Sequence, residues 1–75
     1  MPGFVIQYSR STGNCRVTPY LQDNGADLAF EDRMSREATN RDPDVEIVSV
    51  IAPSLDDVRR THARYFVREN YAKVA

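Results

Sequence analysis

One run of residues sets the centre of any fold that this chain can adopt: Val-Glu-Ile-Val-Ser-Val-Ile-Ala at positions 45–52. It is the strongest β-strand pattern in the chain, and both sets of alternating positions are largely apolar. Such a strand is typical of an internal position in a sheet. The 75 residues suffice for a single small domain, 1–75, and exclude a two-domain enzyme, a Rossmann domain or a TIM barrel. At this size a lone core is only marginally stabilising, which favours oligomerisation.

Two further strands are predicted near the N-terminus. Residues 4–9 alternate in a pattern that suits a strand with one strongly apolar face. Gly13 and Asn14 both tolerate positive φ, so a hairpin turn is expected there. Residues 15–21 alternate again, and Pro19 has no backbone N–H to donate, so this second strand is expected either to lie at a sheet edge or to end near Pro19.

Two helices are predicted from helical periodicity. The first covers residues 26–40, where apolar residues recur every four positions and define one face: Ala26, Phe30, Met34 and Ala38. The second follows Pro53, is capped by Ser54 and is expected to span 55–71. At about 100° per residue its core face holds six residues: Leu55, Val58, His62, Tyr65, Phe66 and Glu69.

This order of elements, ββαβα, predicts an α+β two-layer sandwich. The connection between the second and third strands is long enough for a right-handed crossover that contains a helix. Placing strand 45–52 beside strand 4–9 leaves the strand with Pro19 at an edge. We therefore expect a three-stranded mixed sheet of order 2-1-3, with both helices on one face.

Composition limits the setting in which the chain works. One cysteine excludes an intrachain disulfide, and no apolar run approaches the roughly 20 residues of a membrane-spanning helix. The first residues have no basic region or long apolar segment, so no signal peptide is evident and a cytoplasmic location is expected. The net charge of −1 conceals an uneven distribution of charge along the chain, because residues 21–57 are strongly acidic and residues 58–75 are basic.

The second predicted helix carries the feature that most resembles a working surface. A second apolar stripe runs beside its core face: Ala63, Val67, Tyr71 and Val74. An arginine stripe lies next to it: Arg60, Arg64 and Arg68. An apolar centre with an arginine rim is favoured at protein interfaces, so Val67 and Tyr71 are predicted to contact a second copy or another protein. The alternative is a helix that frays near Glu69, with arginines that are only solvated.

No catalytic or metal-binding group is evident in the sequence. His62 is the only histidine, and it is expected to be a packed residue bonded to a carbonyl, since nothing joins it to Cys15, the only thiol. Cys15 is expected to be half-buried on its strand and unreactive. The acidic pairs at 42–44 and 56–57 fit a loop and a helix N-terminus better than a metal site. The three glycines are scattered, so no phosphate-binding loop, cofactor or small-molecule substrate is predicted.

The chain as a whole resembles a group of proteins. The strand Phe-Val-Ile-Gln-Tyr, the strand Val-Glu-Ile-Val and the segment Thr-His-Ala-Arg-Tyr-Phe at 61–66 carry the likeness, which covers most of residues 4–66. Together they resemble small uncharacterised ββαβα proteins of actinobacteria and their phages. The resemblance implies a cytoplasmic setting and no particular activity.

Three functions remain open at this point. The first is a non-enzymatic protein-interaction or regulatory accessory module, self-associating as a homodimer through the C-terminal helix. The second is nucleic-acid binding, with phosphate contacts from one group of side chains: Arg59, Arg60, Arg64 and Arg68. The third is a phage-type inhibitor that presents the acidic middle segment to a host protein. An enzyme with a site shared across a dimer is the weakest of the hypotheses.

Overall fold

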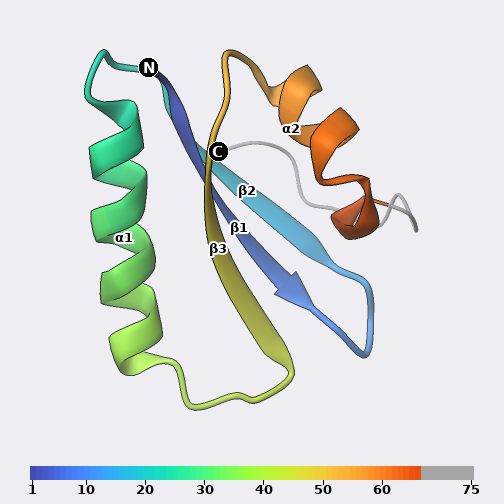
Figure 1. The fold of residues 1–75 in the computed structure, drawn as a ribbon. Helices are drawn as coiled ribbons and strands as arrows, with labels where there is room; N and C mark the ends of the chain where they lie inside the picture. Colours follow the sequence, from blue (N-terminus) through green and yellow to red (C-terminus); the bar gives the residue numbers. More distant parts are fainter. Residues whose placement is uncertain (67–75) are drawn as a thin grey trace.

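A computed structural model of the chain describes residues 1–66 (Figure 1). The elements follow the predicted order: β1 (Gly3–Ser9), β2 (Cys15–Tyr20), α1 (Gly25–Thr39), β3 (Val45–Ile51) and α2 (Leu55–Thr61), followed by a 3₁₀ turn, η1 (Ala63–Tyr65). The α+β class and the ββαβα order are therefore confirmed. The expected hairpin turn is also present, because Gly13 has a φ of 79° and its N–H donates to the carbonyl of Ser9 at 2.8 Å.

The sheet has the predicted order, β2-β1-β3, but it is not mixed. β1 pairs antiparallel with both of its neighbours, with Val5 opposite Thr18 on β2 and opposite Ser49 on β3. The crossover makes β2 and β3 parallel to each other, yet β1 lies between them and runs the opposite way. Every hydrogen-bonded pair of strands is consequently antiparallel. Pro19 lies on an edge strand, as its missing N–H predicted.

The two helices lie on opposite faces of the sheet, so the expected two-layer arrangement with both helices on one face is wrong (Figure 1). Successive residues of β1 point to opposite faces. Phe4 and Ile6 pack with Val58 of α2, whereas Val5 between them packs with Ala29 of α1. All three β1 residues are fully buried. Since both faces of β1 are apolar, each face needs its own covering layer, and one helix cannot supply both.

The larger part of the core lies on the α2 side of the sheet. Tyr65 and Phe66 from the end of the described chain are buried there, beside Val58 and the strand residues. Leu55 and His62 are half-buried. Four of the predicted core residues thus pack in the core, namely Leu55, Val58, Tyr65 and Phe66, although the last two follow α2 and do not belong to it. Glu69 lies outside the described residues.

The second helix is shorter than the predicted 55–71. α2 ends at Thr61, and His62 leaves the helical region with φ −121° and ψ 45°. The chain then forms the short 3₁₀ turn that brings Tyr65 and Phe66 against the sheet. The predicted extension from 67 to 71 lies outside the described residues.

α1 packs on the sheet through a face that the sequence analysis did not select. The buried residues of the helix are Gly25 and Ala29, whereas Phe30 is 53% exposed and Met34 is 50% exposed. Small residues are needed because the backbone comes very close: a Cβ atom on Gly25 would stand 2.0 Å from the carbonyl oxygen of Tyr20. The apolar stripe that includes Phe30 and Met34 therefore faces away from the protein's own core.

Candidate protein-interaction surface

β3 is an edge strand with an open side, in contrast to the internal position that its composition suggested. Its apolar character on both faces reflects the helical layers on either side of the sheet. The N–H of Ala52 donates to Pro2, and the N–H of Arg10 donates to the carbonyl of Asp44. In an antiparallel pair this places the even-numbered residues of β3 in hydrogen bonds with β1. The odd-numbered residues direct their N–H and C=O groups outward.

Three residues of β3 leave these outward groups without a partner within residues 1–66. The outward groups of Val45 are occupied, since its N–H donates to Asp42 at 3.1 Å and its carbonyl accepts from Asn40 at 3.5 Å. Ile47, Ser49 and Ile51 have no such contacts within that part of the chain, so they form a bare strand edge. An unpaired edge of this kind is a template for pairing with another strand.

The opposite edge of the sheet differs in this respect. The N–H of Ser9 donates to the carbonyl of Asn14, so the even-numbered residues of β2 bond to β1. The main-chain groups of the odd-numbered residues, Cys15, Val17 and Pro19, are directed outward. Proline has no N–H, so the outer side of β2 is interrupted where another strand would need a donor. Natural sheets protect edges in this way. Nothing comparable interrupts β3 between Ile47 and Ile51.

The exposed apolar stripe of α1 lies on the flank of the helix that faces β3. Arg33 and Glu37 border a recess together with Ile47 of β3, whereas Asp32 on the other flank bonds to Tyr20 of β2. Phe30 precedes Arg33 by three residues and Glu37 by seven, so it shares their flank. The stripe and the open edge of β3 are therefore neighbours.

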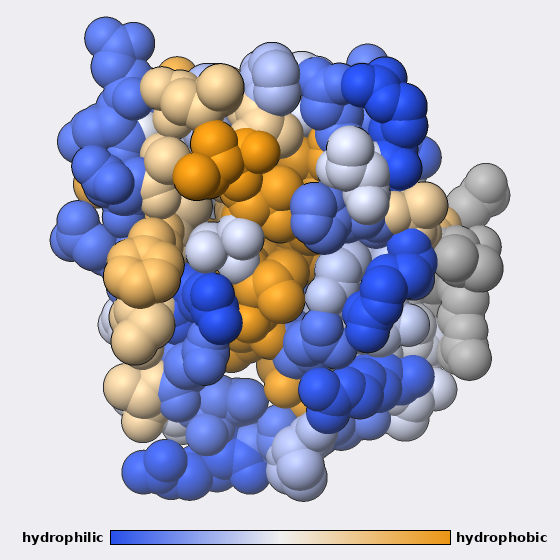
Figure 2. Space-filling model, viewed as in Figure 1, coloured by the Kyte–Doolittle hydropathy of each residue, from blue (hydrophilic) through white to orange (hydrophobic). Residues whose placement is uncertain are grey.

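Figure 2 shows this surface in the view in which β3 is nearest to the reader. Apolar surface runs over α1 and along β3, and charged residues border it. The most exposed large apolar residues that belong to these two elements are Phe30, Met34 and Ile51, the last with 65% of its surface exposed. We define the α1–β3 face by these three residues together with Ile47 and Ser49.

A polar network holds α1 in place behind this face. The guanidinium of Arg36 donates to Asp32 at 2.9 Å, to Thr18 at 3.1 Å and to Gln7 at 3.4 Å. The hydroxyl of Tyr20 donates to Asp32 at 2.6 Å. Burial alone would raise the pKa of Asp32, but these hydrogen bonds and the charge of Arg36 outweigh it and lower that pKa. The network fixes the helix against two strands at once.

The recess beside the C-terminal half of α1 is polar, and its charges are already matched. Arg33 pairs with Glu37 at 2.5 Å, and Asn40 is tied to the loop that follows the helix. Within residues 1–66 no buried side-chain nitrogen or oxygen lacks a hydrogen-bond partner. The charged side chains that line the recess are therefore already paired with one another or with Glu46.

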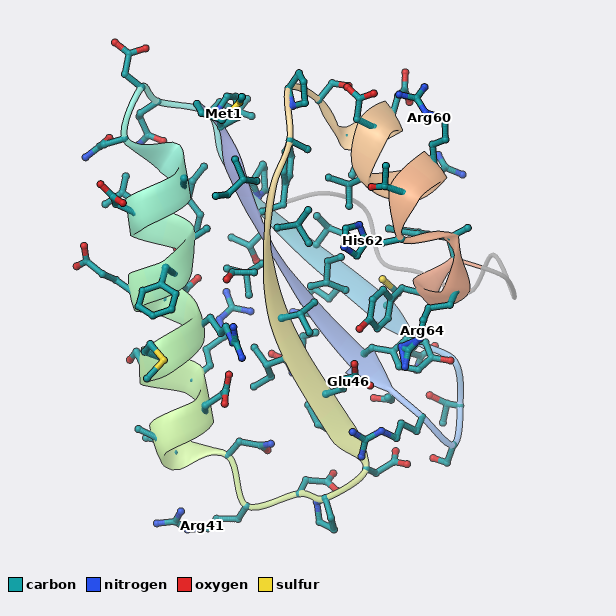
Figure 3. All side chains as sticks on the ribbon, viewed as in Figure 1. Met1, Arg41, Glu46, Arg60, His62 and Arg64 are labelled. Carbon is teal, nitrogen blue, oxygen red and sulfur yellow. The ribbon has the colours of Figure 1, made fainter. Side chains whose placement is uncertain are left out.

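A second polar cluster ties η1 to β3 on the other side of the sheet. Glu46 accepts a hydrogen bond from the Tyr65 hydroxyl at 2.5 Å and faces Arg64 at 3.3 Å and Arg10 at 3.5 Å. Figure 3 shows Glu46 and Arg64 approaching each other from these two elements. The Tyr65 hydrogen bond is the main reason why the pKa of Glu46 is lowered. Burial, and then the bond to Glu46, raises the pKa of Tyr65 to about 12.

These shifts predict how a Tyr65→Phe variant behaves with pH. The Glu46 contribution is present above its ordinary pKa of 4.5 and is lost as the pH falls through the lower folded value. The Tyr65 contribution is complete below pH 10 and is lost as the pH rises toward 12. Wild type should therefore exceed the variant by about 1 kcal/mol in free energy of unfolding near neutrality. Urea unfolding from acid to alkaline pH should show this difference shrinking at both ends, and a constant difference would contradict the assignment.

Of the arginines predicted to form a partner or phosphate surface, those within residues 1–66 are engaged within the protein's own chain. Arg60 pairs with Asp57, and Arg64 lies over the Tyr65 ring at 4.4 Å while it also pairs with Glu46. Arg59 lies 5.7 Å from the centre of the Phe66 ring.

The predicted interface stripe is not one continuous helical face within the described residues. Ala63 is exposed, but it belongs to η1 and not to α2. Four of the predicted contact residues lie outside the described residues: Val67, Arg68, Tyr71 and Val74. Their contacts stay predictions. Sequence reasoning missed the α1–β3 face, and the only signal for it was the Phe30 and Met34 stripe, which was predicted as one apolar face of the helix with no partner named for it.

The two side chains considered as possible catalytic groups, His62 and Cys15, have positions that suit a structural role. His62 contacts the Thr61 hydroxyl through Nδ1 at 2.9 Å and terminates α2. Cys15 is fully buried rather than half-buried, and burial raises the pKa of its thiol to about 11. Across residues 1–66, histidine, cysteine, aspartate and glutamate form no group of three or more that could hold a metal ion. Over the same range no helix is long and apolar enough to cross a membrane.

No protein-family model matches the chain, and comparison with curated proteins and with solved structures gives no match.

Proposed function

We propose that the protein is a small non-enzymatic interaction module that binds another polypeptide through the α1–β3 face. The observation that carries this proposal is the coincidence of two unsatisfied features on one surface. The main-chain groups of Ile47, Ser49 and Ile51 lack partners within residues 1–66, and the apolar stripe of α1 runs beside them. An added strand would satisfy the first feature, and its side chains or an attached helix would cover the second.

This proposal moves the contact surface from the C-terminal helix to the other side of the sheet. The earlier hypothesis needed a helix long enough to carry an apolar stripe past Phe66, whereas α2 ends at Thr61. The α1–β3 face lies wholly within the described elements. The paired arginines of α2 and η1 support internal tethering and give no particular support to nucleic-acid binding.

Site-specific photo-crosslinking tests the proposal. A photoreactive amino acid at position 34, in the chain expressed in its native cells, should give a discrete covalent adduct with a polypeptide. The same probe at Ser35, which is exposed on α1 but outside the stripe, is the control and should give none. The position 34 adduct should disappear when Ile51→Lys is added, because a lysine on the open edge hinders strand pairing. Equal labelling from both positions, or an adduct that survives Ile51→Lys, would count against this surface.

A further inference from the structure

We infer that the polypeptide bound at the α1–β3 face is a second copy of this chain, joined by antiparallel pairing of β3 with β3. This inference rests on the proposed function and names its partner. The result would be a continuous sheet of order β2-β1-β3-β3-β1-β2, with the two-fold axis passing beside Ser49.

The unpaired groups of β3 are self-complementary. They belong to Ile47, Ser49 and Ile51, so they are placed symmetrically about Ser49. In an antiparallel pair centred there, Ser49 lies opposite Ser49 of the second copy, and Ile47 lies opposite Ile51 of the second copy. Each opposed pair exchanges two hydrogen bonds, which gives about six in total. The occupied groups of Val45 fall outside this set, so nothing has to be broken to form it.

The same pairing brings the exposed stripes of the two α1 helices together. α1 lies mainly over β1 and β3. Strands are about 4.8 Å apart, so the axes of the two helices would lie two strand spacings, or about 10 Å, from each other. Packed helices lie about 8–10 Å apart. The helices therefore meet at contact distance without any change in the protomer.

The level of the axis along α1 also fits. Val5 lies opposite Ser49 on the sheet and packs against Ala29, the neighbour of Phe30. Phe30 consequently lies close to the axis and faces Phe30 of the second copy. One turn further on, Met34 faces Ala26 of the second copy, so a large side chain meets a small one.

The charges on α1 favour this antiparallel arrangement. The N-terminal half of the helix, residues 25–31, carries Asp27 and Glu31, whereas the C-terminal half, residues 33–39, carries two arginines, Arg33 and Arg36, and one acid, Glu37. Two α1 helices related by the axis place the acidic half of each beside the basic half of the other, and their dipoles oppose.

The outer edges explain why assembly stops at two copies. Once β3 is paired, the sheet formed by the described residues has open edges only at β2, and Pro19 interrupts each of them. The interface is therefore isologous and closes as a dimer, rather than growing into an extended sheet.

Sedimentation velocity of the purified full chain, over about 1–100 µM, tests the inference. Wild type should sediment as a dimer at the upper concentrations. Ser49→Pro removes an outward N–H that bonds to nothing within residues 1–66, and it should raise the dimer dissociation constant about 10- to 100-fold. Ser49→Ala keeps the N–H and is the matched control, with a dissociation constant within about threefold of wild type. Should Ser49→Pro fail to fold by circular dichroism, Ile51→Lys takes its place, since residue 51 is exposed.

Disulfide trapping tests the register. Residues that oppose each other in a hydrogen-bonded pair have Cα atoms about 5.5 Å apart, which a disulfide can span. Ser49→Cys should thus cross-link to itself on mild oxidation, while Ile51→Cys should not, because its counterpart lies about 13 Å away, four residues along the strand. Cys15 is fully buried and does not interfere.

Each outcome separates this inference from the function on which it rests. A wild-type chain that stays monomeric at every concentration overturns the inference, as does a dimer that Ser49→Pro leaves unchanged or one that Ile51→Cys traps. In that case, a position 34 adduct with a different protein would leave the proposed function standing. Loss of the adduct as well would reject both.

Discussion

Alanine in place of Gly25 is expected to lower the free energy of unfolding by about 3 kcal/mol or more, the upper range of overpacking. The added methyl would stand 2.0 Å from the Tyr20 carbonyl oxygen and 2.9 Å from the Gly3 nitrogen. Both neighbours are backbone atoms held by the sheet, so no side chain can rotate away to make room. The N-terminus of α1 would have to lift off the sheet, and the contacts of Ala29 would weaken with it.

Chemical denaturation followed by circular dichroism measures this effect. Asn24→Ala is the matched control, because residue 24 is exposed and its side chain makes no capping hydrogen bond. It should change the free energy of unfolding by less than about 0.5 kcal/mol. If Gly25→Ala matched this control, the close approach of α1 to β1 and β2 would not exist.

Phe4→Ala is expected to cost about 3–5 kcal/mol, the range for deleting a buried phenylalanine side chain. Phe4 is 1% exposed and belongs to the cluster that joins the sheet to Val58 and Phe66. Small domains have a total stability of about 5–15 kcal/mol, so this one change would remove a large part of it.

The measurement is again the free energy of unfolding, compared with two other variants. Phe4→Leu retains most of the volume and should cost less than about 1.5 kcal/mol. Leu21→Ala removes an apolar side chain that is 67% exposed and should cost less than about 0.5 kcal/mol. A Phe4→Ala cost as small as that of Leu21→Ala would contradict the position of Phe4 at the centre of the core.

Local chemistry made the order and the ends of the strands predictable. Alternation identified the first two strands and a run that is apolar on both faces identified the third, and the strand boundaries agree with the structure to within about one residue. Pro19 predicted an edge strand because its ring removes a donor, which is a property of one residue and needs no knowledge of the rest of the fold. The predicted crossover makes β3 parallel to β2, and the predicted order places β1 between them. These two predictions together require β3 to be antiparallel to β1, so the expectation of a mixed sheet did not agree with them.

The packing of α1 could not be predicted by looking for large apolar residues. Its contact with the sheet uses Gly25 and Ala29, followed by Arg36, whose hydrogen bonds depend on partners from two strands. A search for hydrophobic periodicity gives little weight to glycine and none to arginine, so it selected the stripe with Phe30 and Met34 instead. The α1–β3 face was missed because the stripe was predicted as one face of the helix without a partner, and because the strand 45–52 was read as typical of an internal position in the sheet.

The length of α2 was overestimated because its sequence contains no breaker after Pro53. The residues from Ala63 to Tyr65 are compatible with a helix, and only tertiary packing ends the helix at Thr61. The change to a 3₁₀ turn allows Tyr65 to reach Glu46 while Phe66 is buried beside Val58. The end of the helix at Thr61 is thus set by contacts between residues that lie far apart in the sequence, such as Tyr65 and Glu46.

The central position of β1 has a consequence for the order in which the protein is synthesised. β1 and β2 leave the ribosome first, but β3 is complete only roughly 30 residues after Tyr20. At about 5–20 residues per second this delay lasts roughly 2–6 s. Throughout that time the nascent hairpin has one side of β1 unpaired and its Phe4 face without the cover of α2, while its Val5 face can be covered only after α1 has followed. The strand that is most completely enclosed in the finished protein is therefore the one whose protection during translation matters most.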